Sequence, residues 1–129
     1  ACHLLNKPLV TAALLRFEGQ VFTFKRTVPK TACYRCVFPE PPAADLVPRC
    51  ETAGVLGPLC GVLGSLQATE VLKEIMHIGD SMAGSMLLYD ALGPMFRKVK
   101  LKHDPACKLC GDHPSLTDLS HHSDTGAVC

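Results

Sequence analysis

A chain of 129 residues is long enough to bury a hydrophobic core and fits a single domain. Its composition, 47% hydrophobic and 19% charged, excludes a disordered protein. The formal net charge is +1, and no basic stripe is interleaved with aromatic residues, so nucleic acid is not expected as a partner. Eight cysteines fit a secreted disulfide framework, but four fall in CxxC pairs and no signal-peptide pattern is present. We therefore expect a reducing, cytoplasmic compartment.

The first residues predict the end of a helix. Residues 1–6 (ACHLLN) read as a last helical turn, with Asn6 as its C-terminal stop. Because a domain seldom begins inside an element, we expect this chain to be the C-terminal portion of a longer protein.

Two β-strands are predicted next. The apolar run 8–15 (PLVTAALL) indicates a strand covered on both faces. Residues 17–20 (FEGQ) can reverse the chain, with Gly19 supplying a positive φ. Residues 21–24 (VFTF) favour a second strand.

The segment 38–48 contains four prolines, which preclude a helix or a central strand and favour an extended loop. Such a loop is either a linker or a segment that crosses over an active site.

A long helix is expected over residues 54–77. It carries a stripe of small residues that would let it approach another backbone closely, although each interior glycine costs about 1 kcal/mol relative to alanine. The stripe consists of Gly54, Gly57, Gly61, Gly64 and Ala68. The apolar part is shorter than the roughly 20 residues that span a bilayer and is interrupted by glycines and Pro58. We predict a buried helix, with Cys60 as a packing residue, and no membrane partner.

Residues 85–92 and 95–102 predict a hairpin that turns at Gly93 and Pro94. The lysines of its second strand are interpreted as a solvated row that protects a sheet edge, with a phosphate site as the alternative. These lysines are Lys98, Lys100 and Lys102. The polar stretch 112–129 is expected to be a flexible tail, although its three histidines are also potential metal ligands. They are His113, His121 and His122.

The strongest signal is the pair of CxxC motifs, Cys33 with Cys36 and Cys107 with Cys110. Together they supply the four thiolates of a tetrahedral Zn²⁺ site, and a metal between distant motifs closes a long loop. The segment between them is about four times longer than the roughly 15–20 residues of a compact zinc ribbon. Redox dithiols or disulfides, and unrelated thiols, therefore remain as alternatives.

Six segments resemble the adenylyltransferases of the MoeB/ThiF family, and the molybdopterin-synthase type is nearest. They are 7–20 (KPLVTAALLRFEGQ), 33–42 (CYRCVFPEPP), 50–57 (CETAGVLG), 64–68 (GSLQA), 89–92 (YDAL) and 104–111 (DPACKLCG). The resemblance covers almost the whole chain except the tail. It implies a Rossmann-like α/β domain, of which residues 1–111 would form the C-terminal portion.

Several site assignments follow from the resemblance. It implies that Cys33, Cys36, Cys107 and Cys110 bind structural zinc. The segment 38–49 would be the crossover loop that lies over the C-terminal tail of a carrier protein. Cys50 matches the position at which some members carry a cysteine for thioester or acyl-disulfide chemistry, and a loop residue without catalytic role is the alternative.

The resemblance also implies a reaction. Members activate the C-terminal glycine of a ubiquitin-like sulfur carrier with ATP and Mg²⁺, for molybdopterin or thiamin synthesis, and they form homodimers. Catalysis needs a phosphate-binding glycine loop, a cation and a magnesium-binding acid, and this chain shows none of them. We expect these groups upstream, and we expect the 129-residue chain alone to be inactive.

The sequence thus favours an α/β fold with a mixed sheet, a buried helix and a four-cysteine zinc clip. The main functional hypothesis is the C-terminal part of a sulfur-carrier adenylyltransferase. One alternative is a zinc-stabilised module that binds a carrier tail without catalysis. Another is a dithiol oxidoreductase.

Overall fold

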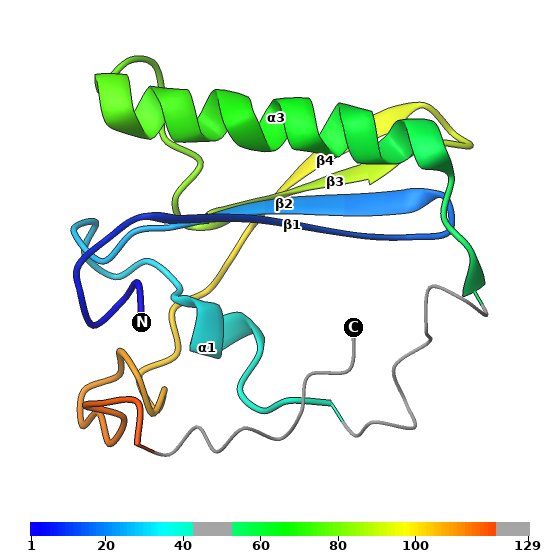
Figure 1. Cartoon of the computed structure of the whole chain (residues 1–129). Helices are drawn as coiled ribbons and strands as arrows, with labels where there is room; N and C mark the ends of the chain where they lie inside the picture. The colour runs from blue at the N-terminus through cyan, green and yellow to red at the C-terminus, as the bar shows by residue number, and fades with distance from the viewer. Residues whose placement is uncertain (43–52, 121–129) are drawn as a thin grey trace.

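The structure, a computed structural model, describes residues 1–42 and 53–120. Four strands of these residues form one sheet in the order β1-β2-β3-β4, and the helices α1 and α3 lie on opposite sides of it (Figure 1). The strands are β1 (Leu9–Leu15), β2 (Glu18–Phe24), β3 (Ser85–Asp90) and β4 (Met95–Lys100). The helices are α1 (Tyr34–Val37) and α3 (Gly57–Met76).

The sheet is antiparallel at each of its three strand pairs, so the expected mixed sheet is wrong for the described residues. Hairpins join β1 to β2 and β3 to β4, and the predicted turn at Gly93 and Pro94 is confirmed. The long connection through α3 returns the chain beside β2, again in the antiparallel sense. A parallel bridge between Arg16 and Val55 lies outside the strands.

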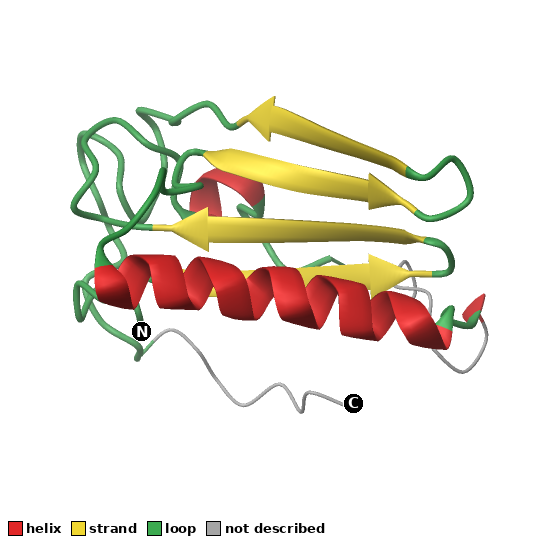
Figure 2. Ribbon diagram, turned by 90° about the horizontal axis from the view of Figure 1, so that it is seen from above, coloured by secondary structure: helices red, strands yellow, loops and turns green. Residues whose placement is uncertain are grey.

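The buried strand is β2 rather than β1. β1 lies at an edge of the sheet and is mostly half-buried, whereas the second half of β2, from Val21 to Phe24, is buried. β2 has a neighbouring strand on each side, and α3 packs on it and on β1, running alongside the strands (Figure 2). The core between helix and sheet contains Val21, Leu59, Leu63 and Met82.

Gly19 has a different role from the one expected. The chain reverses before Gly19, at Arg16, which adopts a positive φ of 54°. Gly19 itself already lies in the sheet, where it is paired with Leu14 and Tyr89. A Cβ atom on Gly19 would lie 2.2 Å from Cδ1 of Leu63. Glycine is therefore needed at this position because α3 packs closely on β2.

Helix α3 covers the sheet with one side only, so the prediction of a buried helix is wrong within the described part of the chain. Leu59, Leu63 and Glu74 are its buried residues, while Leu72 and Ile75 are 55% and 67% exposed. Cys60 is exposed and is not a packing residue.

The small-residue stripe of α3 also points away from the sheet. At three of its glycines a Cβ atom would have no neighbour within 4 Å; these are Gly57, Gly61 and Gly64. The close approach expected of this stripe is thus not made by the described residues. The helix ends at Met76 and is followed by the C-cap residue His77, whose φ of 54° is left-handed.

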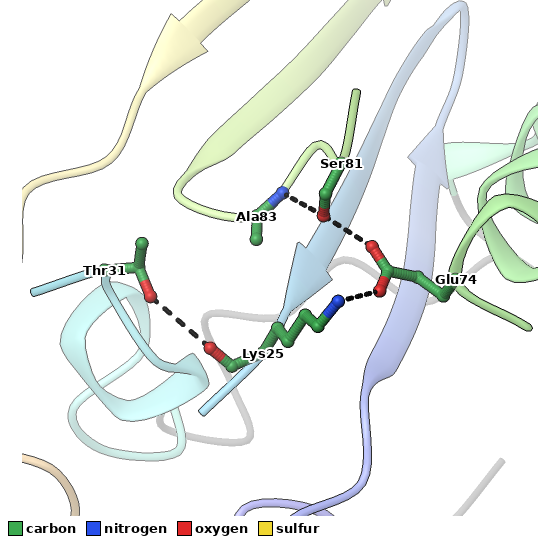
Figure 3. Close-up of polar contacts among 5 residues, drawn as sticks. All are labelled: Lys25, Thr31, Glu74, Ser81 and Ala83. Carbon is green, nitrogen blue, oxygen red and sulfur yellow. Dashed lines mark hydrogen bonds and ion pairs between the residues drawn. The ribbon is translucent and has the colours of Figure 1, made fainter. Parts of the chain in front are cut away.

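A polar cluster anchors the C-terminal end of α3 to the sheet (Figure 3). Lys25 Nζ donates to Glu74 Oε2 at 2.7 Å, and the Ser81 hydroxyl donates to Glu74 Oε1. Ser81 Oγ in turn accepts from the backbone N–H of Ala83 at 3.2 Å. The buried carboxylate thereby joins α3 to Lys25, directly after β2, and to the connection that leads to β3.

Two further expectations are confirmed at the ends of the fold. Leu5 N donates to Ala1 O at 3.0 Å, and the turn stops at Asn6, whose φ is 52°. The lysines Lys98, Lys100 and Lys102 are exposed along or just beyond the edge strand β4. In the described ranges no helix is long and apolar enough to cross a membrane.

Candidate metal centre

The first CxxC motif is positioned by α1 and by aromatic packing under the sheet. Cys33 directly precedes α1, and Cys36 N donates to Cys33 O at 3.1 Å, so one tight turn brings both sulfurs to the same side. Tyr34 packs edge-on against Phe24 of β2, with ring centroids 5.7 Å apart. This contact seats the motif on the sheet face opposite α3 (Figure 1).

The second motif is a compact turn with its own backbone hydrogen bonds. Cys107 N donates to Asp104 O at 3.1 Å, and Gly111 N donates to Cys107 O at 2.9 Å. Leu109 N points at the Cys107 sulfur, with an N···S distance of 3.5 Å. A Cβ atom on Gly111 would lie 2.4 Å from Pro105 O, so only glycine fits where the chain leaves the motif.

The fold brings the two motifs together. The four Sγ atoms of Cys33, Cys36, Cys107 and Cys110 all lie within 4.8 Å of one another. Measured S···S distances are 3.8 Å for Cys33–Cys36, 3.6 Å for Cys33–Cys107 and 3.3 Å for Cys36–Cys110. Four sulfurs about 2.3 Å from a central Zn²⁺ are about 3.8 Å apart, so the donor set fits this ion in number, chemistry and spacing.

None of the four cysteines forms a disulfide, and burial opposes ionisation of Cys33, Cys107 and Cys110. Burial raises the pKa of Cys33 to about 11, and it also raises the pKa of Cys110, where Cys33 and Cys36 add to the effect. Burial opposes ionisation of Cys107 too, but backbone N–H groups of Leu109 and Cys110 outweigh it and lower its pKa. Four thiolates at such distances require a cation, because their mutual repulsion otherwise keeps protons bound.

Some residues that support the second motif could not be predicted from the spacing of the cysteines. His103 Nε2 lies 3.1 Å from Cys110 O. Ser115 N and Leu116 N both donate to Lys108 O at 2.9 Å, so the chain beyond Gly111 folds back on the second motif. A glycine directly after a CxxC is a turn signal in the sequence, whereas the pairing of His103 depends on how the chain folds back.

The start of the proline-rich segment is attached to the cysteine cluster. The Phe38 ring packs edge-on against Phe22 at 5.7 Å, and Arg35 Nη1 donates to Pro39 O at 2.9 Å. Lys108 and Glu40 form an exposed ion pair at 3.4 Å. Residues 43–49 of the expected loop, together with Cys50, His121 and His122, lie outside the described residues. His113 is exposed.

The sequence is similar to that of curated adenylyltransferases. It is 48% identical over 123 residues to "Adenylyltransferase and sulfurtransferase MOCS3" of Sus scrofa, which covers 95% of this chain and 27% of the relative. It is 47% identical over 122 residues to "Sulfur carrier protein adenylyltransferase" of Thermus thermophilus, which covers 92% of this chain and 45% of the relative. The chain thus spans between about a quarter and a half of these proteins.

Solved structures share the fold. A crystal structure of E. coli MccB has a TM-score of 0.65 and 18% sequence identity, with 95% of this chain and 35% of that chain covered. A second, of E. coli MccB with MccA-N7isoASN, has a TM-score of 0.67 over 86% of this chain and 35% of that chain, with 16% identity. Residues 1–109 match the ThiF family. The chain belongs to the ThiF family.

Proposed function

We propose that this chain is the C-terminal portion of an ATP-dependent adenylyltransferase that activates the C-terminal glycine of a ubiquitin-like sulfur carrier. The observation that carries the proposal is the 47–48% identity to relatives named as adenylyltransferases over more than nine-tenths of the chain. We favour molybdopterin synthesis as the pathway that the carrier serves, and thiamin synthesis is the alternative. The protein would work in the cytoplasm as a homodimer, and the exposed apolar side chains of α3 support self-association.

The reaction would join the glycine carboxylate of the carrier to the α-phosphate of ATP, giving an acyl-adenylate and pyrophosphate. ATP and Mg²⁺ would be bound by the additional length that the relatives possess. ATP–pyrophosphate exchange with carrier present tests both points. The longer protein should catalyse exchange and this chain should not. Exchange by the 129-residue chain would place the ATP site within it, and carrier binding without exchange by the longer protein would favour a non-catalytic binding module.

We infer that Cys33, Cys36, Cys107 and Cys110 hold one structural Zn²⁺. The ion would supply a fixed tetrahedral tie between the ends of two hairpins, and the buried sulfurs would be shielded from redox chemistry. Zinc content and thiol reactivity test the assignment. Cys107→Ser should lose most of the zinc, whereas Cys60→Ser, at an exposed cysteine of α3, should retain it. Rapid disulfide cycling within one motif in the native protein would favour the oxidoreductase instead.

The segment 38–49 is proposed as a crossover loop above the carrier tail, with Cys50 as a catalytic cysteine. The support is its anchored start, where Phe38, Pro39 and Glu40 contact β2, α1 and the second motif. A Cys50→Ser variant of the longer protein should lose any thiol-sensitive conjugate with the carrier but keep exchange activity. Cys60→Ser is the matched control. A conjugate that survives in Cys50→Ser would remove Cys50 from the mechanism.

A further inference from the structure

A cavity of about 530 Å³ lies beside the cysteine cluster and is separate from α3 and from the proline-rich segment. Its walls come from the N-terminal segment as far as Leu9, the chain from Phe24 to Arg35, and the chain around and beyond the second CxxC. A volume between roughly 300 and 1,000 Å³ is typical of sites for small organic ligands. The cavity is therefore large enough for a ligand well beyond the size of a simple ion.

The cationic side chains on its walls are Lys7, Lys25, Arg26, Lys30 and Arg35. Lys25 is neutralised by Glu74, but the other four form no ion pair with a described residue. Arg26 and Arg35 donate to backbone carbonyls, of His3 and Pro39, which leaves their charge uncompensated.

Negative charge near the cavity is smaller. Asp118 is the single carboxylate on the described walls. A Zn²⁺ bound by four thiolates would add two formal negative charges, so the four unpaired cations still exceed the total. Burial, with help from the charge of Arg26, lowers the pKa of His3, which keeps this ring neutral. The balance of charge on the cavity walls consequently favours anions.

Many of the remaining wall residues are apolar. They include Leu4, Val28, Leu109 and Leu116, each half-buried. A ligand that fits both the apolar and the cationic walls has an apolar body and an anionic head. Burial of the body against apolar side chains is favourable, and arginine and lysine bind the head. We propose that this cavity binds an organic anion with an apolar body and a carboxylate or phosphate head.

Anilinonaphthalene sulfonate, which joins an apolar ring system to one anionic head, is a direct probe. Fluorescence titration of the zinc-loaded chain should give saturable binding with one equivalent. In Arg26→Gln/Lys30→Gln the Kd should rise at least about tenfold. Lys98→Gln/Lys100→Gln on the exposed edge strand β4 removes the same charge away from the cavity and should stay within about twofold. An unchanged Kd in the first variant would overturn the proposal.

Localisation separates the cavity from the apolar side of α3. Backbone amide shifts induced by the probe should appear at Val28 and Leu109 and be absent at Ile75; shifts confined to α3 would refute the assignment. Octanoate and octyl phosphate then compete with the probe. Displacement by one identifies the head group, displacement by both shows that either is accepted, and displacement by neither would also refute it. Retained zinc content and circular dichroism show that the variant is folded, and Lys7→Gln serves as a replacement if it is not.

Discussion

At Gly111 the backbone passes so close to the second CxxC motif that no side chain fits. A Cβ atom would approach Pro105 O, Cys107 O and Cys107 N at 2.4, 2.6 and 2.7 Å. These are backbone atoms, which do not move aside as the end of a flexible side chain does. The turn that aims Cys107 and Cys110 at the first motif therefore depends on this glycine.

We predict that Gly111→Ala destabilises the chain by roughly 1–3 kcal/mol, as overpacking does. It should also weaken zinc binding by about tenfold or more, since displaced supporting groups change ligand geometry. Chelator competition and denaturant unfolding measure the two effects. Gly61→Ala is the control, because nothing lies within 4 Å of a Cβ there and a helical alanine should stabilise by roughly 0.5–1 kcal/mol. Equal zinc affinity in both variants would contradict the prediction.

The carboxylate of Glu74 is a second site at which one side chain decides stability. Burial raises its pKa, but hydrogen bonds from Lys25 and Ser81 and the charges of Lys25 and Lys73 outweigh this and lower it from 4.5. The folded pKa is below the unfolded value. The resulting stability is present above about pH 4.5 and is lost as the pH falls through the folded pKa.

We expect Glu74→Gln to cost roughly 1.5–3 kcal/mol at pH 7, the range for hydrogen bonds to charged groups. The difference from the parent chain should shrink on acidification below about pH 4.5, where the parent carboxylate becomes protonated. Urea unfolding at several pH values measures it. Glu40→Gln, in the exposed pair with Lys108, should cost about 0–1 kcal/mol at pH 7. A cost for Glu74→Gln that does not change with pH would argue against the ion pair as its cause.

Among the elements, the contact of α3 with β2 depends on a small residue in the strand rather than in the helix. Gly19 lies beneath Leu63, and the glycines of α3 face outward. The glycine stripe predicted that the helix itself makes the close approach. The glycines do line one side of the helix, but that side faces away from the sheet. Which partner supplies the small residue depends on the rotation of the helix about its axis.

Gly19→Ala should destabilise the fold by roughly 1–3 kcal/mol, because its Cβ would overlap Leu63. Leu63→Ala alone should cost about 2–5 kcal/mol. The double variant should cost less than the sum, since truncation of Leu63 removes the clash. Thermal and urea unfolding of the three variants give the coupling energy. Gly64→Ala, with open space around its Cβ, is the matched control, and additive costs would show that Gly19 and Leu63 do not compete for space.

At the scale of the whole molecule, the C-terminal half of α3 is inverted in polarity. Glu74 is buried against the sheet, while Leu72, Ile75 and Met76 are more than half exposed. Such a surface favours association, because removing apolar side chains from water lowers the free energy.

We predict that Leu72→Glu/Ile75→Glu reduces self-association of the chain, measured as a shift toward monomer in sedimentation velocity, with little loss of stability. Leu92→Glu/Met95→Glu changes two exposed apolar residues in the β3–β4 hairpin by the same charge and serves as the control. If both variants reduce association equally, added charge rather than the α3 surface is responsible.

Much of the local structure could be predicted from the sequence because its signals are local. Gly93 and Pro94 turn a hairpin, Asn6 stops a helical turn, and a two-residue spacer brings two sulfurs to one side. Even the adjacency of the two CxxC motifs was anticipated, since four thiols in two such pairs point to one ion.

The placement of those elements needed the tertiary structure. An apolar run does not indicate which strand is central. We expected β1 to be the buried strand, whereas the structure buries β2. Helical periodicity predicts a helix but not which side packs on the sheet. Leu59 and Leu63 of α3 are buried there together with Glu74, whose carboxylate is held by Lys25 and Ser81. The cavity beside the cysteine cluster has walls from three distant segments. Burial and cavities are sums over contacts between distant residues, and only the folded chain specifies those contacts.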